Sequence, residues 1–358
     1  MGEAKALAMD ASFDWDSLAK IALADGLAPL LYRQLNSQDW APEPFQVLLR
    51  NANLYNASTN SVLFFELEKL LNELEEDKIP CVLLKGAALA GTIYANIALR
   101  PMVDIDLLVH PHDLPKIQQI LINDGYQSFK TELRGEAALQ FDNETVLFKT
   151  GMRTIPVELH WSLFNSPYYQ AKIAMEWFWQ TSLPAASNGS PSRILGPEAQ
   201  LLHLCGHLWL QHSGNELLWM HDMVEWIFHY QDEIDWSELL GRAKDCLLIV
   251  PFKQIMPVMR EEFGAPIPDD FLDSLEAIEP STIEIDTIQQ IKGMDRGAGQ
   301  RFWDDLRAIP RYGDKFIFAW QKIFPSWEYM RQRYQVSHPA LLPLYYIYRL
   351  YLGLRTSR

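Results

Sequence analysis

Apolar residues recur three and four positions apart over most of the chain, which is the spacing of helices with one buried face. In the first 78 residues this pattern predicts two helices within residues 12–36, separated by Gly26, and one long helix or two in line from Phe45 to Asp77. The pattern returns after residue 196 and predicts a region that is almost entirely helical. The helices predicted there span 197–212, 216–230, 235–247, 249–263, 280–292, 298–308, 313–323 and 326–335.

Between residues 79 and 165 the pattern changes to short apolar runs and alternating positions, which predict strands. The predicted strands are Cys81–Leu84, Met102–Val109, Tyr126–Lys130, Ala138–Phe141, Thr145–Lys149 and 155–161. Two helices are predicted among them, one over Ala87–Asn96 and one that begins at Asp113 and runs to about Asn123. An aromatic helix, Tyr168–Trp179, and a flexible loop at 185–192 follow.

These changes of pattern divide the chain into three predicted parts. Residues 1–78 form a helical N-terminal region, residues 79–183 a mixed domain, and residues 184–358 a helical C-terminal domain. The expected fold class is therefore α+β, with a small mixed sheet between a helical N-terminal region and a large helical C-terminal region.

Two acidic residues interrupt the apolar strand predicted over Met102–Val109. Because successive side chains of a strand point to opposite faces, Asp104 and Asp106 share one face. Two neighbouring carboxylates repel each other and lose solvation unless a cation or a proton compensates them. A hard, oxygen-seeking ion such as Mg²⁺ is the natural compensation.

A third carboxylate fits the same arrangement. Alternation over 155–161 places Glu158 and His160 on one face, and a strand here could lie beside the strand that carries Asp104 and Asp106. Three carboxylates suit a site for two divalent ions, which clamp the attacking and leaving oxygens of a phosphoryl or nucleotidyl group. An Asp-x-Asp alone is common and mostly solvated, so the combination carries this hypothesis.

The ordered combination of these motifs resembles a known family. The motifs are Lys85-Gly86, then Arg100-x-x-x-Asp104-x-Asp106, and then Glu158-Leu-His160-Trp161. Together they are similar to the uncharacterised nucleotidyltransferase family of the DNA polymerase beta-like superfamily, over roughly residues 80–165 and more loosely beyond. The resemblance implies that residues 79–183 form a nucleotidyltransferase palm. It also implies that Asp104, Asp106 and Glu158 are the catalytic triad that binds the metal.

The activity that this resemblance implies is metal-dependent nucleotidyl transfer. A nucleoside monophosphate group would pass from a nucleoside triphosphate to a hydroxyl of a small molecule, sugar, peptide or protein, with Mg²⁺ or alternatively Mn²⁺ as cofactor. The turn at Gly86 would let the triphosphate approach the backbone, and Lys85 and Arg100 would neutralise phosphate charge. Arg100 has a second interpretation, in which an ion pair lets it hold the acidic strand in place.

One position departs from the superfamily pattern. The small hydroxyl residue usual after the turn glycine is Ala87 here, which cannot donate a side-chain hydrogen bond to a phosphate. This departure supports an alternative from another functional class, a non-catalytic nucleotide-binding or partner-binding protein on a decayed palm. The two hypotheses differ in whether the chain binds Mg²⁺ and nucleotide together and releases pyrophosphate.

Polar residues at the start of the helical region are candidates for substrate contacts. His203 and His207 share a helix face, but no Glu follows His203 as a metalloprotease motif requires, so zinc is disfavoured and buried core histidines are the simplest interpretation. We expect His160, His207 and Asp222 to contact substrate, although Asp222 could equally cap a helix or pair with a basic group. The acceptor cleft is then expected between the palm and the helices at 197–230.

The composition narrows the classes of molecule that the chain is expected to bind and the setting in which it is expected to occur. The net charge of -15 and the pI near 5.0 disfavour long nucleic acid, because an acidic surface repels phosphate backbones. Three cysteines without a pairing pattern favour a reduced, cytoplasmic setting. No apolar run reaches the 20 or so residues that span a bilayer. The apolar segment 341–355 is expected to dock on the protein rather than to lie on a membrane surface.

Overall fold

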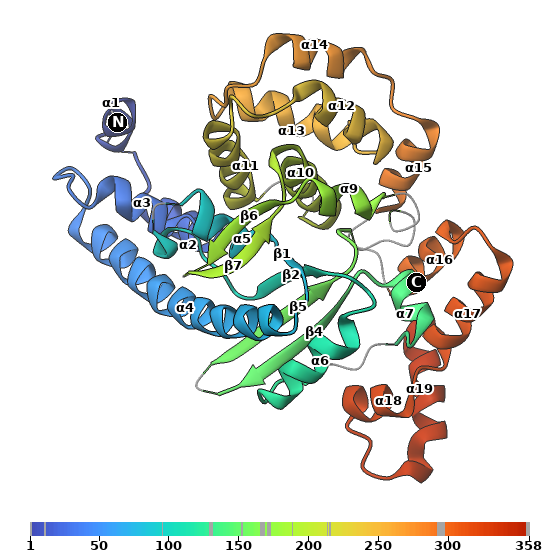
Figure 1. Cartoon of the computed structure of the whole chain (residues 1–358). Coiled ribbons are helices and arrows are strands. Elements are labelled where there is room, and N and C mark those ends of the chain that lie inside the picture. Colours follow the sequence, from blue (N-terminus) through green and yellow to red (C-terminus); the bar gives the residue numbers. More distant parts are fainter. Residues whose placement is uncertain are drawn as a thin grey trace.

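A seven-stranded mixed sheet lies at the centre of the protein, with helices on both sides of it (Figure 1). The computed structural model describes residues 2–10, 12–94, 96–128, 132–151, 153–164, 169, 173–187, 189–212, 214, 216–291 and 298–355. The strands are β1 Cys81–Leu83, β2 Ile105–Val109, β3 Gln127–Ser128, β4 Glu144–Thr150, β5 Thr154–His160, β6 Leu183–Ser187 and β7 Ser190–Ile194. The α+β class predicted from the sequence is therefore confirmed.

The order of strands across the sheet is β3-β4-β5-β2-β1-β7-β6. Strand β2 runs parallel to β5 and antiparallel to β1, and β1 runs parallel to β7. The pairs β3–β4, β4–β5 and β6–β7 are antiparallel. Strands β5, β2 and β1 therefore occupy the middle of the sheet, where strands buried on both faces consist largely of apolar residues.

Helices make up the rest of the described chain. Before the sheet come α1 Gly2–Ala8, α2 Trp15–Ala24, α3 Ala28–Leu35 and α4 Glu43–Glu76. Within the sheet region lie α5 Lys85–Thr92, the 3-10 helix η1 Ile97–Leu99, α6 Leu114–Asn123, α7 Glu136–Phe141 and α9 Met175–Gln180. After it come α10 Pro197–His212, α11 Leu217–His229, α12 Trp236–Asp245, α13 Ile249–Glu261, α14 Asp269–Ala277, α15 Thr282–Ile291, α16 Ala298–Ala308, α17 Tyr312–Ile323, α18 Trp327–Tyr334, η2 Pro339–Leu341 and α19 Leu342–Arg355.

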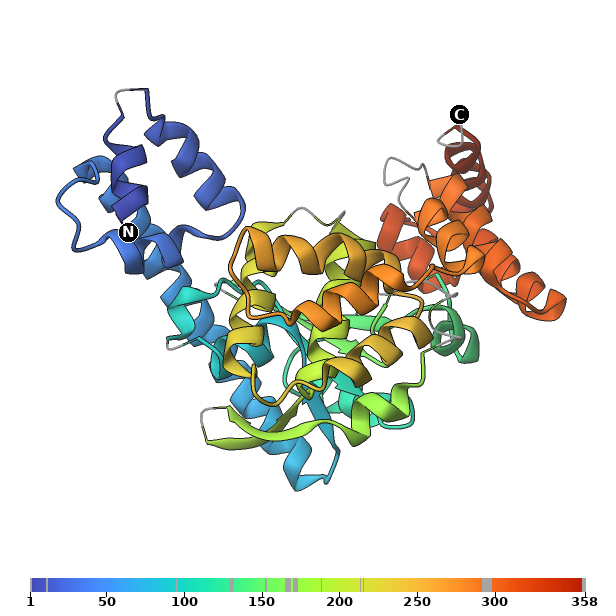
Figure 2. The same cartoon turned by 90° about the horizontal axis from the view of Figure 1, so that it is seen from above.

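The sheet shares one continuous hydrophobic core with α4 and with the helices from α10 to α14. In Figure 1, α10–α13 lie above the sheet, and Figure 2 shows the first three helices and α16–α19 at opposite ends of this central body. Helix α4 is one helix of 34 residues, and Leu63, Leu67 and Leu71 on its inner face are buried. No helix within the described residues is long and apolar enough to cross a membrane.

Two asparagines on the buried face of α4 hold the segment that leads into β2. The Asn56 side chain donates to the carbonyl of Ala98, and the Asn60 side chain donates to the carbonyl of Arg100 at 2.7 Å. An amide buried on an apolar helix face is costly unless its hydrogen bonds are made. These bonds therefore fix residues 98–100 against α4.

The structure corrects several predicted elements. The predicted strand Ala138–Phe141 is wrong, because these residues lie in the helix α7. Ala137 and Phe141, which are one helical turn apart, pack on Ile309 and Phe318. Helix α5 begins at Lys85 and ends at Thr92, not over Ala87–Asn96. Strand β2 begins only at Ile105. The sequence pattern also missed α1 and α14.

The loop predicted at 185–192 is a hairpin instead. Strands β6 and β7 pair from Leu183–Ile194 to Ser187–Ser190, and Gly189 has the positive φ of 91° that such a tight turn requires. Because Leu83 of β1 pairs with Ile194, the hairpin belongs to the central sheet. The proposed division of the chain at residue 183 thus passes through one sheet, and the three-part organisation stays a prediction.

Some predicted ends fall outside the described residues. They are the last residues of the strand Tyr126–Lys130, the first part of the helix Tyr168–Trp179 and the end of the helix 280–292. The described parts are β3, α9 and α15.

The C-terminal helix docks on the protein, as expected. Helix α19 packs on α16 and α18, and the Arg349 guanidinium pairs with the carboxylate of Glu132. The three cysteines are buried and unpaired, as the sequence predicted.

Packing around α10 gives a test of this fold. Gly206 is buried in α10, and a Cβ there would overlap the Phe164 ring. We expect Gly206→Ala to lower the free energy of unfolding by about 1–3 kcal/mol, because overpacking outweighs the gain in helix propensity. Urea unfolding monitored by circular dichroism measures this change.

Gly241 in α12 is the matched control, because nothing lies within 4 Å of the position of its added Cβ. Gly241→Ala should raise the free energy of unfolding by roughly 0.5–1 kcal/mol. Equal effects of the two substitutions would contradict the packing described.

Candidate active site

The register of two parallel strands brings two carboxylates together in the middle of the sheet. Asp106 of β2 pairs with Glu158 of β5, so their side chains leave the same face as neighbours. Asp106 is almost completely buried, and Glu158 is partly exposed. Like charges at such positions repel each other, so this face needs a positive counter-charge.

Lys85 supplies part of that charge. Its Nζ lies 2.7 Å from Oδ1 of Asp106 and 3.6 Å from Oε2 of Glu158. Lys85 is the first residue of α5, directly after the last residues of β1, and it has a left-handed backbone with φ of 44°. Such a conformation is unfavourable for a residue with a Cβ and is found mainly where the surrounding structure enforces it. Here the turn directs the ammonium group between the two carboxylates.

His160 supplies the remaining positive charge. Its Nε2 lies 2.9 Å from Oδ1 of Asp106 and 3.4 Å from Oε2 of Glu158, and its Nδ1 lies 3.1 Å from Oε2 of Glu144. Burial alone would lower the pKa of His160, but hydrogen bonds to Asp106 and Glu158 raise it to about 9. The imidazole is therefore charged at neutral pH, and it holds the carboxylates on three neighbouring strands.

The two residues of the Asp-x-Asp motif differ in their electrostatics. Burial would raise the pKa of Asp106, but Lys85 and His160 keep it well below its usual range. Asp104 precedes β2 and has no such contact. Burial, and then the charges of Asp106 and Glu158, raise the pKa of Asp104 to about 7. The uncompensated charge of the site is thus concentrated on Asp104.

Arg100 is held by a buried ion pair on the side of the helices. Its Nη2 lies 2.8 Å from Oδ2 of Asp222, and the Tyr94 hydroxyl donates to the other carboxylate oxygen at 2.7 Å. The guanidinium group also lies over the ring of Trp219, 5.2 Å from its centroid. Arg100 therefore links η1 and β2 to α11. The partner is Asp222 rather than a residue of the acidic strand itself, and through this ion pair Arg100 holds the segment that leads into that strand, in agreement with our second interpretation of this residue.

The structure supports one of the two roles considered for Asp222, the pairing with a basic group. It does not support the other role, contact with substrate, because the side chain is fully buried behind Arg100 and does not line the cavity. The ion pair occupies its oxygens, so Asp222 positions Arg100. His160 is likewise buried and bound to carboxylates rather than directed at a substrate.

A cavity of about 570 Å³ brings most of the predicted residues together. Its charged wall carries Lys85, Gly86, Arg100, Asp104, Asp106 and Glu158. The opposite wall comes from α10 and α11 and includes His207, His212 and Trp219. The expected cleft between the sheet region and the helices at 197–230 is therefore present, with Asp104 and Asp106 on one side of it.

The two histidines of α10 have different positions. His207 lines the cavity, where its Nε2 lies 3.0 Å from Nε2 of His212 and its ring lies 4.5 Å from that of Trp219. His203 is fully buried, and burial lowers its pKa to about 3, so it is a neutral core residue. Among the described residues, the group that could hold a metal is Asp106, Glu158 and His160, not these histidines.

Glycine at position 86 has a packing reason. A Cβ there would come within 2.7 Å of Met102 and 2.8 Å of Nη1 of Arg100. Only glycine lets α5 approach the chain that leads into β2 so closely. The next residue, Ala87, is buried in the core and does not line the cavity. A hydroxyl group on this side chain would therefore lie in the core rather than at the cavity wall.

The donor set fits a divalent cation. Carboxylate oxygens are the preferred ligands of Mg²⁺, and Asp104, Asp106 and Glu158 all line the cavity. The ligand atoms of Asp106, Glu158 and His160 lie within 4.8 Å of one another. The Lys85 ammonium group already occupies a cationic position between Asp106 and Glu158. These carboxylates therefore favour positive charge, and Lys85 competes with a metal for it.

Sequence patterns missed several residues of the site, and only some of them carried a signal. Asn60 is one of three polar residues, with Asn56 and Thr59, on a mainly apolar helix face, which could have marked it as a buried contact. Glu144 and Tyr94 carried no such signal, because their roles depend on the pairing of β4 with β5 and on the approach of α11.

The comparison with known families agrees with the motifs. A family described as uncharacterised nucleotidyltransferase matches residues 11–264. No curated protein matches the chain. Among solved structures, the chain is similar to an antigenic nucleotidyltransferase-like protein from Paracoccidioides brasiliensis, with 15% identity and a TM-score of 0.36 over 63% of this chain and 96% of that one. It is also similar to ANT(2″)-Ia in complex with adenylyl-2″-tobramycin, with 11% identity and a TM-score of 0.35 over 56% of this chain and 98% of that one.

The unequal charges of the two aspartates lead to a test. A carboxyl group whose pKa is higher in the folded than in the unfolded chain stabilises the fold while it is protonated, and this contribution is lost as the pH rises through the folded pKa. With metal chelated, Asp104→Asn should therefore gain stability relative to the wild type between about pH 5 and pH 8, on the order of 2 kcal/mol. Denaturant unfolding at several pH values measures this difference.

The same substitution two residues later should act in the opposite direction. Asp106→Asn leaves Lys85 and His160 without their main partner, which we expect to cost about 3–5 kcal/mol. Asp77→Asn, at an exposed position, serves as the neutral control.

Stability curves of Asp104→Asn and wild type that run parallel between about pH 5 and pH 8 would contradict the charge distribution described.

Proposed function

The chain belongs to the uncharacterised nucleotidyltransferase family, and on this premise we propose that it is a metal-dependent nucleotidyltransferase that uses a hydroxyl-bearing acceptor. The observation that carries this proposal is the wall of the cavity on which Asp104, Asp106 and Glu158 lie together beside Lys85. Three carboxylates and one lysine at a single cavity suit the handling of phosphate groups and their counter-ions.

Asp104, Asp106 and Glu158 would hold the metal in this proposal. When bound, Mg²⁺ or Mn²⁺ would supply positive charge for the phosphate oxygens and lower the pKa of the acceptor hydroxyl. Asp104 gains most from such a cation, because it lacks the contacts to Lys85 and His160 that compensate Asp106.

The proposed reaction replaces one bond to the α-phosphorus by another. The acceptor oxygen forms a bond to the α-phosphorus of the nucleoside triphosphate, and the bond from that phosphorus to the oxygen bridging to the β-phosphorus breaks. Pyrophosphate leaves, and the acceptor carries the nucleoside monophosphate. Glu158, which is partly exposed in the cavity, accepts the hydroxyl proton.

Cationic side chains would orient the triphosphate. The Lys85 ammonium group can move from Asp106 to a phosphate oxygen, because a flexible four-carbon stem carries it. Arg100 is fixed by Asp222 and Trp219, so it acts as a stationary positive charge at the cavity wall. The opposite wall, with His207 on α10, is proposed to contact the acceptor.

The Lys85–Asp106 contact also favours a second candidate function. In a decayed palm, Lys85 would be a permanent counter-ion in place of a metal, and the protein would bind nucleotide or a partner without transfer. The two candidates differ in how metal affinity responds when Lys85 is removed.

Lys85→Met separates these candidates. If Lys85 competes with a metal, the variant should bind Mn²⁺ about tenfold more tightly, because one charge-assisted contact no longer has to be broken. It should bind the triphosphate more weakly, because a phosphate contact is lost. Titrations of Mn²⁺ by paramagnetic resonance and of nucleotide by calorimetry measure the two effects.

Lys116→Met is the control, because Lys116 forms an exposed ion pair with Asp77. It should change neither affinity. An Mn²⁺ affinity that does not rise in Lys85→Met would support the decayed palm, because no metal would then compete with Lys85.

Transfer itself can be tested with the four triphosphates, each labelled at the α-phosphate, and cell extract as the source of acceptor. We expect metal-dependent labelling of an acceptor with one or more triphosphates. Asp104→Asn and Glu158→Gln should each reduce it by at least about a hundredfold, since each loses a charge that counters the phosphates and their cation.

Asp77→Asn should retain full transfer, because Asp77 lies on the surface at the end of α4. Labelling that persists in Asp104→Asn and Glu158→Gln would contradict the assignment of these carboxylates.

A further inference from the structure

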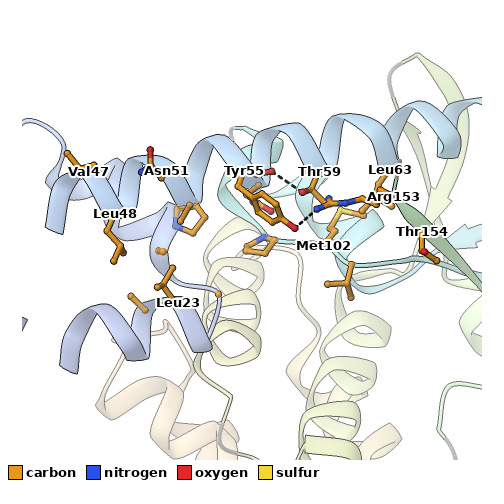
Figure 3. A pocket seen from close by; sticks show the side chains of 18 of the residues that line it. Leu23, Val47, Leu48, Asn51, Tyr55, Thr59, Leu63, Met102, Arg153 and Thr154 are labelled. Carbon is orange, nitrogen blue, oxygen red and sulfur yellow. Dashed lines mark hydrogen bonds between the residues drawn. The ribbon is translucent and has the colours of Figure 1, made fainter. Parts of the chain in front are cut away.

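An apolar groove lies between α2–α3 and α4 (Figure 3). Its volume of about 830 Å³ is within the range of small-molecule sites. Leu23 of α2 and Val47 and Tyr55 of α4 line it, although these side chains are 50%, 48% and 67% exposed. Single exposed apolar side chains are common, whereas several that line one hollow indicate a surface that another molecule covers.

Besides Tyr55 and Arg153, the polar residues that line the groove are Asn51, Asn56, Thr59 and Thr154, and two of them hydrogen-bond within the protein. The Thr59 hydroxyl donates to the carbonyl of Tyr55 at 2.9 Å, and the Asn56 amide donates to Ala98. Arg153 is the charged residue among those that line the groove. Its guanidinium group lies over the Tyr55 ring, 4.9 Å from the centroid, and donates to the Tyr55 hydroxyl. The groove thus offers an occupant mainly apolar contact.

The groove is continuous with the candidate active site. Gly26, Pro101 and Val103 line both the groove and the cavity that holds the carboxylates. Gly26 has a φ of 70°, and a Cβ there would come within 3.1 Å of Leu218. Glycine therefore lets the backbone pass close to Leu218 where the two hollows meet. Val103 is 76% exposed and directly precedes Asp104. The groove therefore ends beside the wall of the cavity that carries the carboxylates.

The two connected hollows have opposite chemistry. Lys85, Arg100, Asp104, Asp106, Glu144 and Glu158 all line the cavity, whereas the groove has Arg153 alone as a charged residue. A triphosphate finds cationic side chains and carboxylates for its metal ion in the first hollow, but only the single cation Arg153 in the second. A substrate that uses both hollows must therefore carry its polar end at Asp104 and its apolar part along α4.

From this juxtaposition we infer that the acceptor is a small amphiphilic molecule, with its hydroxyl at Asp104 and an uncharged alkyl or ring portion in the groove. The inference rests on the proposed function and specifies its acceptor class. A peptide chain fits less well, because it carries a backbone N–H and C=O at nearly every residue, whereas the groove has few polar side chains and those of Asn56 and Thr59 already hydrogen-bond within the protein.

A homologous series of alkyl β-D-glucosides from butyl to octyl, below micelle-forming concentrations, probes the groove. The sugar supplies hydroxyls, and the chain grows by one methylene at a time. We expect kcat/KM for nucleotidyl transfer to rise by up to about fourfold per methylene until the groove is filled. Pyrophosphate release above the rate with water alone measures transfer, and calorimetry measures glucoside binding without nucleotide.

The groove variant is Leu23→Gln with Val47→Gln. Both side chains are half exposed, so the fold should tolerate them. The matched control is Ile21→Gln with Leu54→Gln, on the same two helices, 50% and 56% exposed and outside the groove. The gain in kcat/KM from butyl to octyl should fall at least about tenfold in the groove variant and persist in the control.

The outcomes distinguish this inference from the proposed function. Octyl glucoside that binds the wild type and the control but not the groove variant, with no pyrophosphate released, would support the groove and overturn only the transfer. Transfer that does not depend on chain length would overturn the groove. A groove variant in which only the KM of the triphosphate rises would also overturn the groove as the acceptor site, since the groove would then hold the nucleoside. Transfer to a serine-containing peptide that the groove variant leaves unchanged would also overturn it.

Discussion

The repulsion between Asp106 and Glu158 is the constraint on which the rest of the site depends. The parallel register of β2 and β5 fixes these carboxylates as neighbours, and burial makes their repulsion stronger than it would be in water. Three otherwise unfavourable features follow from it: the left-handed backbone of Lys85, the buried charge of His160 and the proximity of Glu144. Each of them brings positive charge to the carboxylates or supports the group that does.

A second buried ion pair determines where the helical wall lies. Arg100 and Asp222 join the segment before β2 to α11, while Asn60 ties the same segment to α4. Breaking such a pair is costly because it leaves one charge buried and unpaired. The pair therefore fixes the segment before β2, which carries one wall of the cavity, relative to α11, which contributes to the other.

Local patterns predicted the fold well where periodicity was strong, as in α4 and α10. Alternation predicted the face on which Glu158 lies, and the suggestion that its strand lies beside the acidic strand agrees with the pairing of β5 with β2. Local patterns failed where a long-range partner decided the structure. The helix at Ala138–Phe141 packs against α17, and the hairpin at 183–194 completes the sheet beside β1. Sequence also treated the two aspartates as equivalent, because nothing local shows that Lys85 and His160 both contact Asp106.

This inequality determines how charge is distributed in the metal-free site. Lys85 and charged His160 face the carboxylates of Asp106, Glu158 and Glu144, whereas Asp104 contacts neither of these cations. His160 is buried by the sheet and cannot leave, whereas Lys85 sits on a flexible stem at the cavity wall. Lys85 is thus the cation that can be exchanged. If a phosphate group of the nucleotide binds the Lys85 ammonium group, Asp106 and Glu158 lose this cation and bind a metal ion more favourably. Nucleotide and metal are therefore expected to favour each other's binding.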